Sequence, residues 1–143
     1  MQVIEEIEIN KNCHEVAHYA MEPNNDPIWI SGISKVELLT ERPIGIGTQV
    51  QRIAHFLGKQ IDYILEVIEF RENELMVMKS IKSPFPMKVT YQFNNLGDKT
   101  QAQITIEGDS KGFYKIANFL MKPKVSSSLK NDLKNLKEIM ESN

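Results

Sequence analysis

The segment His14-Glu15-Val16-Ala17-His18 has the spacing of a zinc site. Histidines four residues apart lie on one face of a helix, where both can bind the metal and the glutamate can act as a general base. Glu37 lies at about the right distance downstream to be a third ligand. Against zinc, the helix is only about two turns long, Glu15 suits an N-terminal capping acid, and the extended pattern fails at Met21 and Asn24. We expect exposed histidines and no bound metal.

Arg52 is the second residue whose setting suggests chemistry. It alternates with Val50 and Ala54 on a predicted strand, which directs its side chain inward. A buried guanidinium is costly unless it meets a carboxylate, water or an anionic ligand group, and an acid ligand would then bind better than its ester. A one-residue bulge that turns Arg52 to solvent is an equally open alternative. The candidate internal carboxylates are Glu37, Asp62 and Glu66.

Other catalytic patterns are missing from the sequence. It has no Ser-His-Asp or Cys-His arrangement and no phosphate-binding loop, so no catalytic residue is assigned. Cys13 lies near a helix N-terminus, a position that can lower a thiol pKa, but an ordinary thiol is the expectation. As the single cysteine, it cannot form an internal disulfide. The sequence gives little support to catalysis.

The elements that position these residues are mostly strands. From residue 33 to residue 107, apolar and polar residues alternate with the two-residue period of strands, and Gly, Pro and Asn residues mark the turns. This pattern predicts an antiparallel meander preceded by one further strand. The predicted strands are Val3–Ile9, Ile33–Thr40, Thr48–Leu57, Lys59–Phe70, Leu75–Ile81, Met87–Phe93 and Thr100–Glu107.

Helices are predicted at two places. Asn12 offers an N-cap to a short helix with Glu15 three residues on, and the prolines from Pro23 to Pro27 end it before a single further turn at Trp29. After Gly108 the period becomes helical, and one long helix with a bend near Pro123 is expected. Its lysines are predicted to form a solvated face. Its apolar face comprises Phe113, Ile116, Ala117, Leu120, Val125, Leu129, Leu133, Leu136 and Met140.

Composition limits the classes of function. With 143 residues, 41% hydrophobic and 25% charged, the chain is predicted to be a single domain over residues 1–143. Its net charge of −2 and pI of about 5.9 give no overall basic field, so nucleic acid is not an expected partner. No apolar run is long enough for stable membrane insertion, and acidic residues near Met1 do not suit a signal peptide. A cytoplasmic protein is expected.

The order of elements resembles the polyketide cyclase/dehydrase branch of the START-related (SRPBCC) superfamily, which also contains the birch pollen allergen. The likeness spans nearly the whole chain. The residues that carry it are Ile7-Glu8-Ile9, Glu15 to Ala20, Pro27-Ile28-Trp29, Val36 to Thr40, Pro43 to Thr48, Leu57-Gly58-Lys59, Gly112-Phe113 and Leu133 to Lys137.

The resemblance implies an α+β helix-grip fold, in which a curved antiparallel sheet of about seven strands wraps a long C-terminal helix after two short helices. It also implies a cavity between sheet and helix, which relatives use for lipids, polyketides, sterols or hormones. No shared catalytic residues are implied.

Because such a cavity would be lined by inward-facing residues, it yields a set of candidate ligand-binding residues. The hydroxyls of the two tyrosines in this set would orient a ligand, and methionines would supply adaptable walls. The set is Trp29, Val50, Arg52, Phe56, Tyr63, Met78, Tyr91, Phe93, Phe113, Ala117 and Leu120.

Three functions remain open from the sequence. The first is a binding protein for a small hydrophobic molecule of lipid, polyketide or aromatic type, without a cofactor and as a monomer or homodimer. The second is a cyclase or aromatase whose Arg52, Tyr63 or Tyr91 assists proton transfer or holds an enolate. The third is an interaction module, such as a chaperone partner, that acts through its sheet face.

Overall fold

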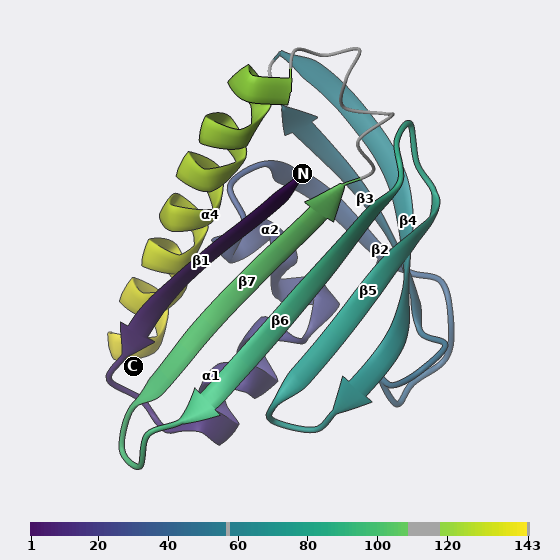
Figure 1. Ribbon diagram of the computed structural model, residues 1–143. Helices are drawn as coiled ribbons and strands as arrows, with labels where there is room; N and C mark the ends of the chain where they lie inside the picture. The colour runs from purple at the N-terminus through teal and green to yellow at the C-terminus, as the bar shows by residue number, and fades with distance from the viewer. Residues whose placement is uncertain (57, 109–117, 143) are drawn as a thin grey trace.

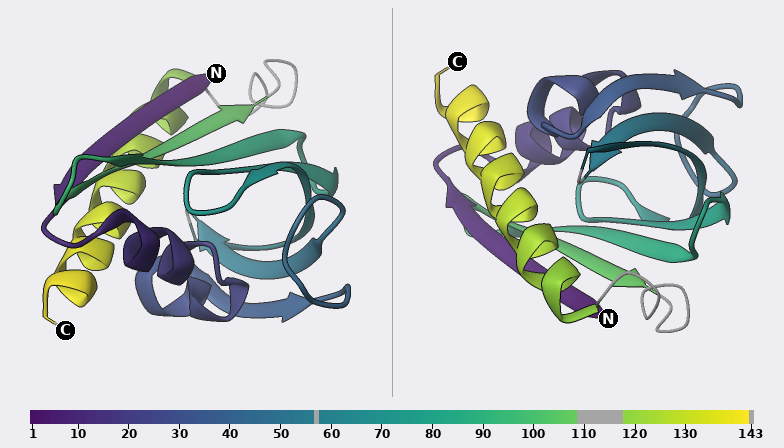
Figure 2. Two further views of the ribbon diagram at one scale, coloured as in Figure 1. Left: turned by 90° about the horizontal axis from the view of Figure 1, so that it is seen from below. Right: turned by 90° about the horizontal axis from the view of Figure 1, so that it is seen from above.

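The computed structural model describes residues 1–56, 58–108 and 118–142. In this part of the chain, seven strands form one antiparallel sheet in the order β1-β7-β6-β5-β4-β3-β2. The sheet curls, and a long C-terminal helix lies along its concave side (Figure 1, Figure 2). The strands are β1 (Gln2–Ile9), β2 (Ile33–Leu38), β3 (Gln49–Phe56), β4 (Lys59–Arg71), β5 (Leu75–Lys82), β6 (Met87–Asn95) and β7 (Thr100–Gly108).

Alternation in the sequence sets the two faces of the sheet. On β6, Val89, Tyr91 and Phe93 are buried, while the polar residues between them are partly exposed. β1 closes the order by pairing antiparallel with β7 over its full length. The predicted helix-grip fold is confirmed, although β2 ends at Leu38 rather than Thr40. Leu57, the predicted end of the third strand, lies outside the described residues.

Short helices follow β1 and pack inside the curl. Asn12 Oδ1 accepts the backbone N–H of Glu15 at 2.9 Å, and Asn12 Nδ2 donates to Glu15 Oε2 at 2.8 Å, so the predicted cap is present. Pro23 then ends the first helix and begins a 3₁₀ turn. The last turn buries both Asp26 and Trp29. These elements are α1 (Cys13–Ala20), η1 (Pro23–Asn25) and α2 (Asp26–Trp29).

The helix α4 (Asn118–Glu141) supplies the other half of the core. Leu129, Leu133 and Leu136 lie on one face and are almost fully buried, which stabilises the fold by roughly 1.5–3 kcal/mol for each side chain. The helix continues through Pro123 without a break. Within the described residues, no helix is long and apolar enough to cross a membrane.

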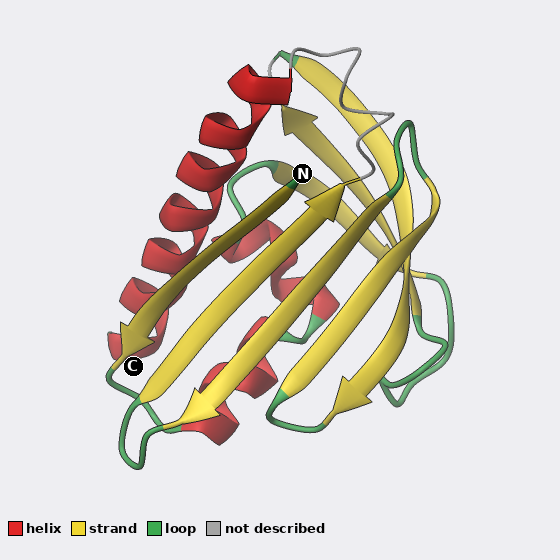
Figure 3. Ribbon diagram, in the orientation of Figure 1, coloured by secondary structure: helices red, strands yellow, loops and turns green. Residues whose placement is uncertain are grey.

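Polar contacts fix α4 along the edge strand β1. Ser126 Oγ donates to Glu5 Oε2 at 2.6 Å, and Lys137 Nζ donates to the backbone carbonyl of Glu8 at 2.7 Å. The described helices all lie on the concave side of the sheet (Figure 3). Between strands β3 to β7 and the N-terminal half of α4 there is a space that only side chains can fill.

Candidate functional site

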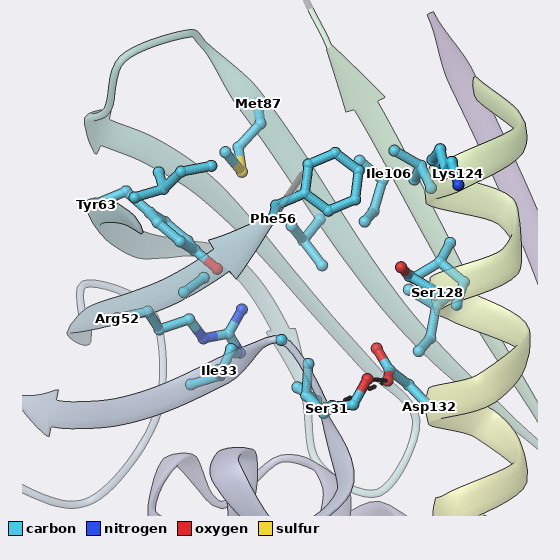
Figure 4. Close-up of a pocket in the computed structure, with 18 of the residues that line it drawn as sticks. Ser31, Ile33, Arg52, Phe56, Tyr63, Met87, Ile106, Lys124, Ser128 and Asp132 are labelled. Atoms are coloured by element: carbon cyan, nitrogen blue, oxygen red, sulfur yellow. Dashed lines mark hydrogen bonds between the residues drawn. The ribbon is translucent and has the colours of Figure 1, made fainter. Parts of the chain in front are cut away.

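That space is a cavity of about 500 Å³ between the concave face of the sheet and α4 (Figure 4). Its walls are mainly apolar, and buried polar side chains lie around Arg52 on β3 and Asp132 on α4. This combination of size, apolar walls and few polar groups is typical of binding sites for small organic molecules. The apolar residues along it include Ile33, Ala54, Phe56, Ile61, Phe85, Met87, Val89, Ile104, Ile106, Val125 and Leu129.

Arg52 faces the interior, as its alternation predicts. β3 is in regular register there with Val36 on β2 and Tyr63 on β4, so the bulge alternative is wrong. The residue is only 4% exposed. Its carboxylate partner is Asp26 on α2, whose Oδ2 lies 2.8 Å from Nη2 and 3.0 Å from Nε. Nη2 also donates to the Tyr91 hydroxyl at 3.1 Å.

The carboxylates that the sequence suggested as partners lie elsewhere, so that prediction was wrong. Asp62 accepts a hydrogen bond from Gln51 at 3.0 Å, and Glu66 accepts one from Gln49 at 2.9 Å. Glu37 is exposed on β2. All three alternate with inward-facing neighbours and therefore lie on the convex face of the sheet, on the side opposite Arg52.

Burial and charge together define the protonation of this cluster. Burial raises the pKa of Tyr91 to about 12, with Arg52 acting against the increase, so the phenol stays protonated. Burial opposes the charge on Arg52, but Asp26 and the hydroxyls of Tyr91 and Tyr63 outweigh it, and the pKa of Arg52 lies well above its usual value. Burial also raises the pKa of Asp26, against the effect of Arg52. Since neutral Asp26 would leave a buried guanidinium without a counter-charge, the two form an ion pair at neutral pH.

Two hydrogen-bonding groups of the cluster remain open to the cavity. Among the described residues, neither Arg52 Nη1 nor the Tyr63 hydroxyl has a hydrogen-bond partner. Figure 4 shows the Tyr63 hydroxyl directed toward the space in front of Arg52. The sheet side of the cavity therefore offers N–H donors and one hydroxyl to a ligand.

Asp132 is the polar group on the opposite side and was not predicted. It is 5% exposed, and its Oδ1 accepts both the backbone N–H and the Oγ–H of Ser31 at 3.0 Å (Figure 4). A signal for it was present in the sequence, because Asp132 falls between Leu129 and Leu133 on the buried face of the helix. Burial raises the pKa of Asp132, and the bonds from Ser31 and the charge of Arg52 lower it in part.

Acidification is expected to stabilise the wild type relative to an Asp132→Asn variant. The pKa of Asp132 is higher in the folded state than in the unfolded state, so the ionised carboxylate costs stability at neutral pH. This cost disappears as the pH falls through the folded and then the unfolded pKa. Urea unfolding of both proteins from about pH 7 to about pH 4 measures it. The prediction would be contradicted if the free energy of unfolding of the wild type, relative to that of the variant, stayed constant or decreased as the pH falls.

The predicted ligand-binding residues fall into four groups. Arg52, Phe56, Tyr63 and Tyr91 lie on the wall of the large cavity. Val50 and Met78 border a space of about 10 Å³ that Arg52 and Tyr91 also contact. Trp29 and Phe93 belong to the buried core and line neither space. Phe113 and Ala117 lie outside the described residues, as does the side chain of Leu120.

The histidine motif lies on the outer surface of α1. His14 and His18 are exposed, and their rings stack with centroids 6.1 Å apart. Glu15 takes part in the cap contacts described above. No cluster of three or more metal-binding side chains exists within the described residues.

Elemental analysis of the purified protein is expected to find no stoichiometric zinc, because two exposed imidazoles alone do not complete a zinc site. The measurement is made on wild type and on His18→Ala. Zinc at one equivalent in the wild type, lost in the variant, would contradict the prediction.

Cys13 is a buried structural thiol. Its Sγ donates to the backbone carbonyl of Asn73 at 3.2 Å. Burial raises the pKa of Cys13, in spite of its place at the start of α1. A thiol with a raised pKa is a weak nucleophile, which agrees with the expectation of an ordinary cysteine.

Comparison with known proteins shows the fold. No family profile matches the sequence, and no curated protein matches it. Among solved structures, a START superfamily protein from Mycobacterium smegmatis is 16% identical with a TM-score of 0.82, covering 99% of this chain and 97% of that one. The Zhui aromatase/cyclase from Streptomyces sp. R1128 is 14% identical with a TM-score of 0.81, covering 99% and 93%.

A third structure, Ara h 8.0201, is 14% identical with a TM-score of 0.74 and covers 100% of this chain and 99% of its own. These likenesses show that the chain has the fold that these three structures share, which is the helix-grip fold that the sequence resemblance implied. At such low sequence identity, these likenesses are evidence for the fold and not for a shared function.

Proposed function

We propose that this chain binds a small hydrophobic molecule in the cavity between the sheet and α4 and acts as a carrier or sequestering protein for it. The observation that carries the proposal is the cavity itself, about 500 Å³ of mainly apolar space beside the buried core. Protein interiors rarely leave such volumes unfilled unless they serve a ligand.

The polar groups of the cavity support a ligand with a few oriented hydrogen bonds. Arg52 Nη1 and the Tyr63 hydroxyl lie on the sheet side, and Asp132 lies on the helix side. The remaining walls are suited to an aromatic, polyketide or lipid body. The names of the structural neighbours, a START superfamily protein and an aromatase/cyclase, agree with this class of ligand.

Native mass spectrometry of freshly purified protein tests the proposal. A retained small molecule, released on denaturation and extractable into organic solvent, is the expected result. A protein that carries no ligand, and that also fails to bind naphthalene-based fluorescent probes after delipidation, would contradict it.

The second candidate is an enzyme of cyclase type, favoured by the convergence of Arg52, Tyr63 and Tyr91 on one side of the cavity. N–H and O–H donors in a water-poor site would stabilise an enolate formed next to a carbonyl. The test is incubation with a short poly-β-keto thioester. Loss of one water mass from the product, slowed in Arg52→Met, would favour the enzyme over the carrier.

A further inference from the structure

The charges around the cavity do not favour an acid. Arg52 is already paired with Asp26, at 2.8 Å between Nη2 and Oδ2, so the two together contribute no net charge. Asp132 adds a carboxylate on the opposite wall. Met1 also lines the cavity, and its α-ammonium donates to the backbone carbonyl of Gly108 at 3.1 Å. Among the described side chains that line the cavity, the only other lysine or arginine is Lys124, which is exposed to solvent. Its charge is therefore screened by water.

Asp132 has hydrogen-bonding capacity to spare. Both bonds from Ser31 go to Oδ1, and Oδ2 has no hydrogen-bond partner among the described residues. Oδ2 is nevertheless accessible, because the only described side-chain polar atom that is both fully buried and without a hydrogen bond is Trp29 Nε1. A carboxylate oxygen is a strong acceptor, and in an apolar cavity it gains most from a donor on the ligand.

We propose that the cavity selects an uncharged ligand that donates a hydroxyl hydrogen bond to Asp132 Oδ2, and that Asp132 discriminates against carboxylates. This inference rests on the proposed binding function and reverses the preference for acids expected from Arg52 in the sequence. Arg52 Nη1 then serves as a donor to a carbonyl or ether oxygen of the ligand. A carboxylate in the same place would lose its hydration and face the carboxylate of Asp132, while Arg52 is already paired with Asp26.

Three matched probes of nearly equal size test the selection: 2-naphthol, which has a hydroxyl donor, 2-methoxynaphthalene, which has none, and 2-naphthoate, which is an anion. Binding to the wild type is measured by calorimetry or intrinsic probe fluorescence at neutral pH. We expect naphthol to bind about tenfold more tightly than the methyl ether, and naphthoate to bind most weakly.

The variant Asp132→Asn removes the charge and keeps an oxygen that can accept from Ser31. It is expected to tighten naphthoate binding by about tenfold and to reduce the advantage of naphthol over the ether to within about threefold. Glu138→Gln is the matched control, because Glu138 is an exposed carboxylate on the same helix outside the cavity. It should leave all three affinities unchanged.

The outcomes separate the two proposals. If none of the probes binds the wild type, the binding function fails and the selectivity fails with it. If the probes bind but naphthoate matches or exceeds naphthol, or if the two variants shift naphthoate equally, the binding function stands and the selection by Asp132 is overturned. If Asp132→Asn does not fold, the wild type still tests the preference for an uncharged donor, because naphthol that binds no more tightly than the methyl ether would overturn it.

Discussion

Replacing Asp26 with Asn is expected to lower the free energy of unfolding by about 3–5 kcal/mol, the usual cost of removing one partner from a buried ion pair. Asp26 and Arg52 are 2% and 4% exposed, so water cannot replace the lost carboxylate. Asn keeps the shape of the side chain and one acceptor oxygen but leaves the guanidinium without its counter-charge. Urea unfolding at neutral pH, monitored by the fluorescence of Trp29, measures the change.

A double variant distinguishes charge from packing. In Asp26→Asn with Arg52→Met, the buried cation is gone as well, and the double variant is expected to be more stable than Asp26→Asn alone. Glu74→Gln is the matched control, since it breaks an exposed pair in which Arg71 Nη1 lies 3.5 Å from Glu74 Oε1. That change should have little effect. A double variant whose loss equals the sum of the two single losses would contradict the account of Asp26 as the counter-charge.

The pairing of Asp26 with Arg52 also shows what sequence patterns could not reveal. The direction of Arg52 followed from strand alternation, which is a local property. Its partner lies 26 residues away in the sequence, on a single helical turn between Asn25 and Pro27, where an aspartate is typical of an exposed turn. Only the packing of α2 inside the curled sheet turns this residue inward.

Periodicity predicted the sheet well because strand alternation is a local property. It showed which face of the sheet each residue lies on, but not whether an inward residue packs in the core or lines the cavity. Phe56 and Phe93 both lie on the inward face, yet Phe56 reaches the cavity and Phe93 packs in the core. The difference arises because Phe93 lies near the start of α1, where the Cys13 thiol is within 3.8 Å of its backbone carbonyl. Where α1 packs against the sheet, as at Phe93, an inward residue is enclosed in the core, whereas the inward residue Phe56, away from α1, reaches the cavity.

Asp132 was missed for a different reason. Its position on the apolar stripe of α4 was visible, but among the charged residues of that helix only the lysines were assigned to a face, and Asp132 was not considered. A buried carboxylate needs donors, and these come from Ser31, 101 residues earlier in the chain. A polar residue on an apolar stripe should therefore be treated as a site candidate, even when its donors cannot be identified from the sequence.

Filling the cavity from α4 is expected to abolish ligand binding while leaving the fold intact. Ser128 lines the cavity, and its hydroxyl makes no hydrogen bond to a described residue. In Ser128→Trp, the indole would occupy part of the cavity in place of the ligand, so affinity for 2-naphthol should fall by about a hundredfold or more. The free energy of unfolding should change by less than about 1 kcal/mol.

The stability measurement decides whether the space is a true cavity, since a Trp forced into a tightly packed core would cost roughly 1–3 kcal/mol or more through strained side chains. Lys130→Trp is the control, because Lys130 is exposed on the same helix and does not line the cavity. It introduces the same side chain without filling the space and should leave naphthol binding unchanged. If Ser128→Trp binds naphthol as the wild type does, naphthol does not occupy the part of the cavity beside Ser128.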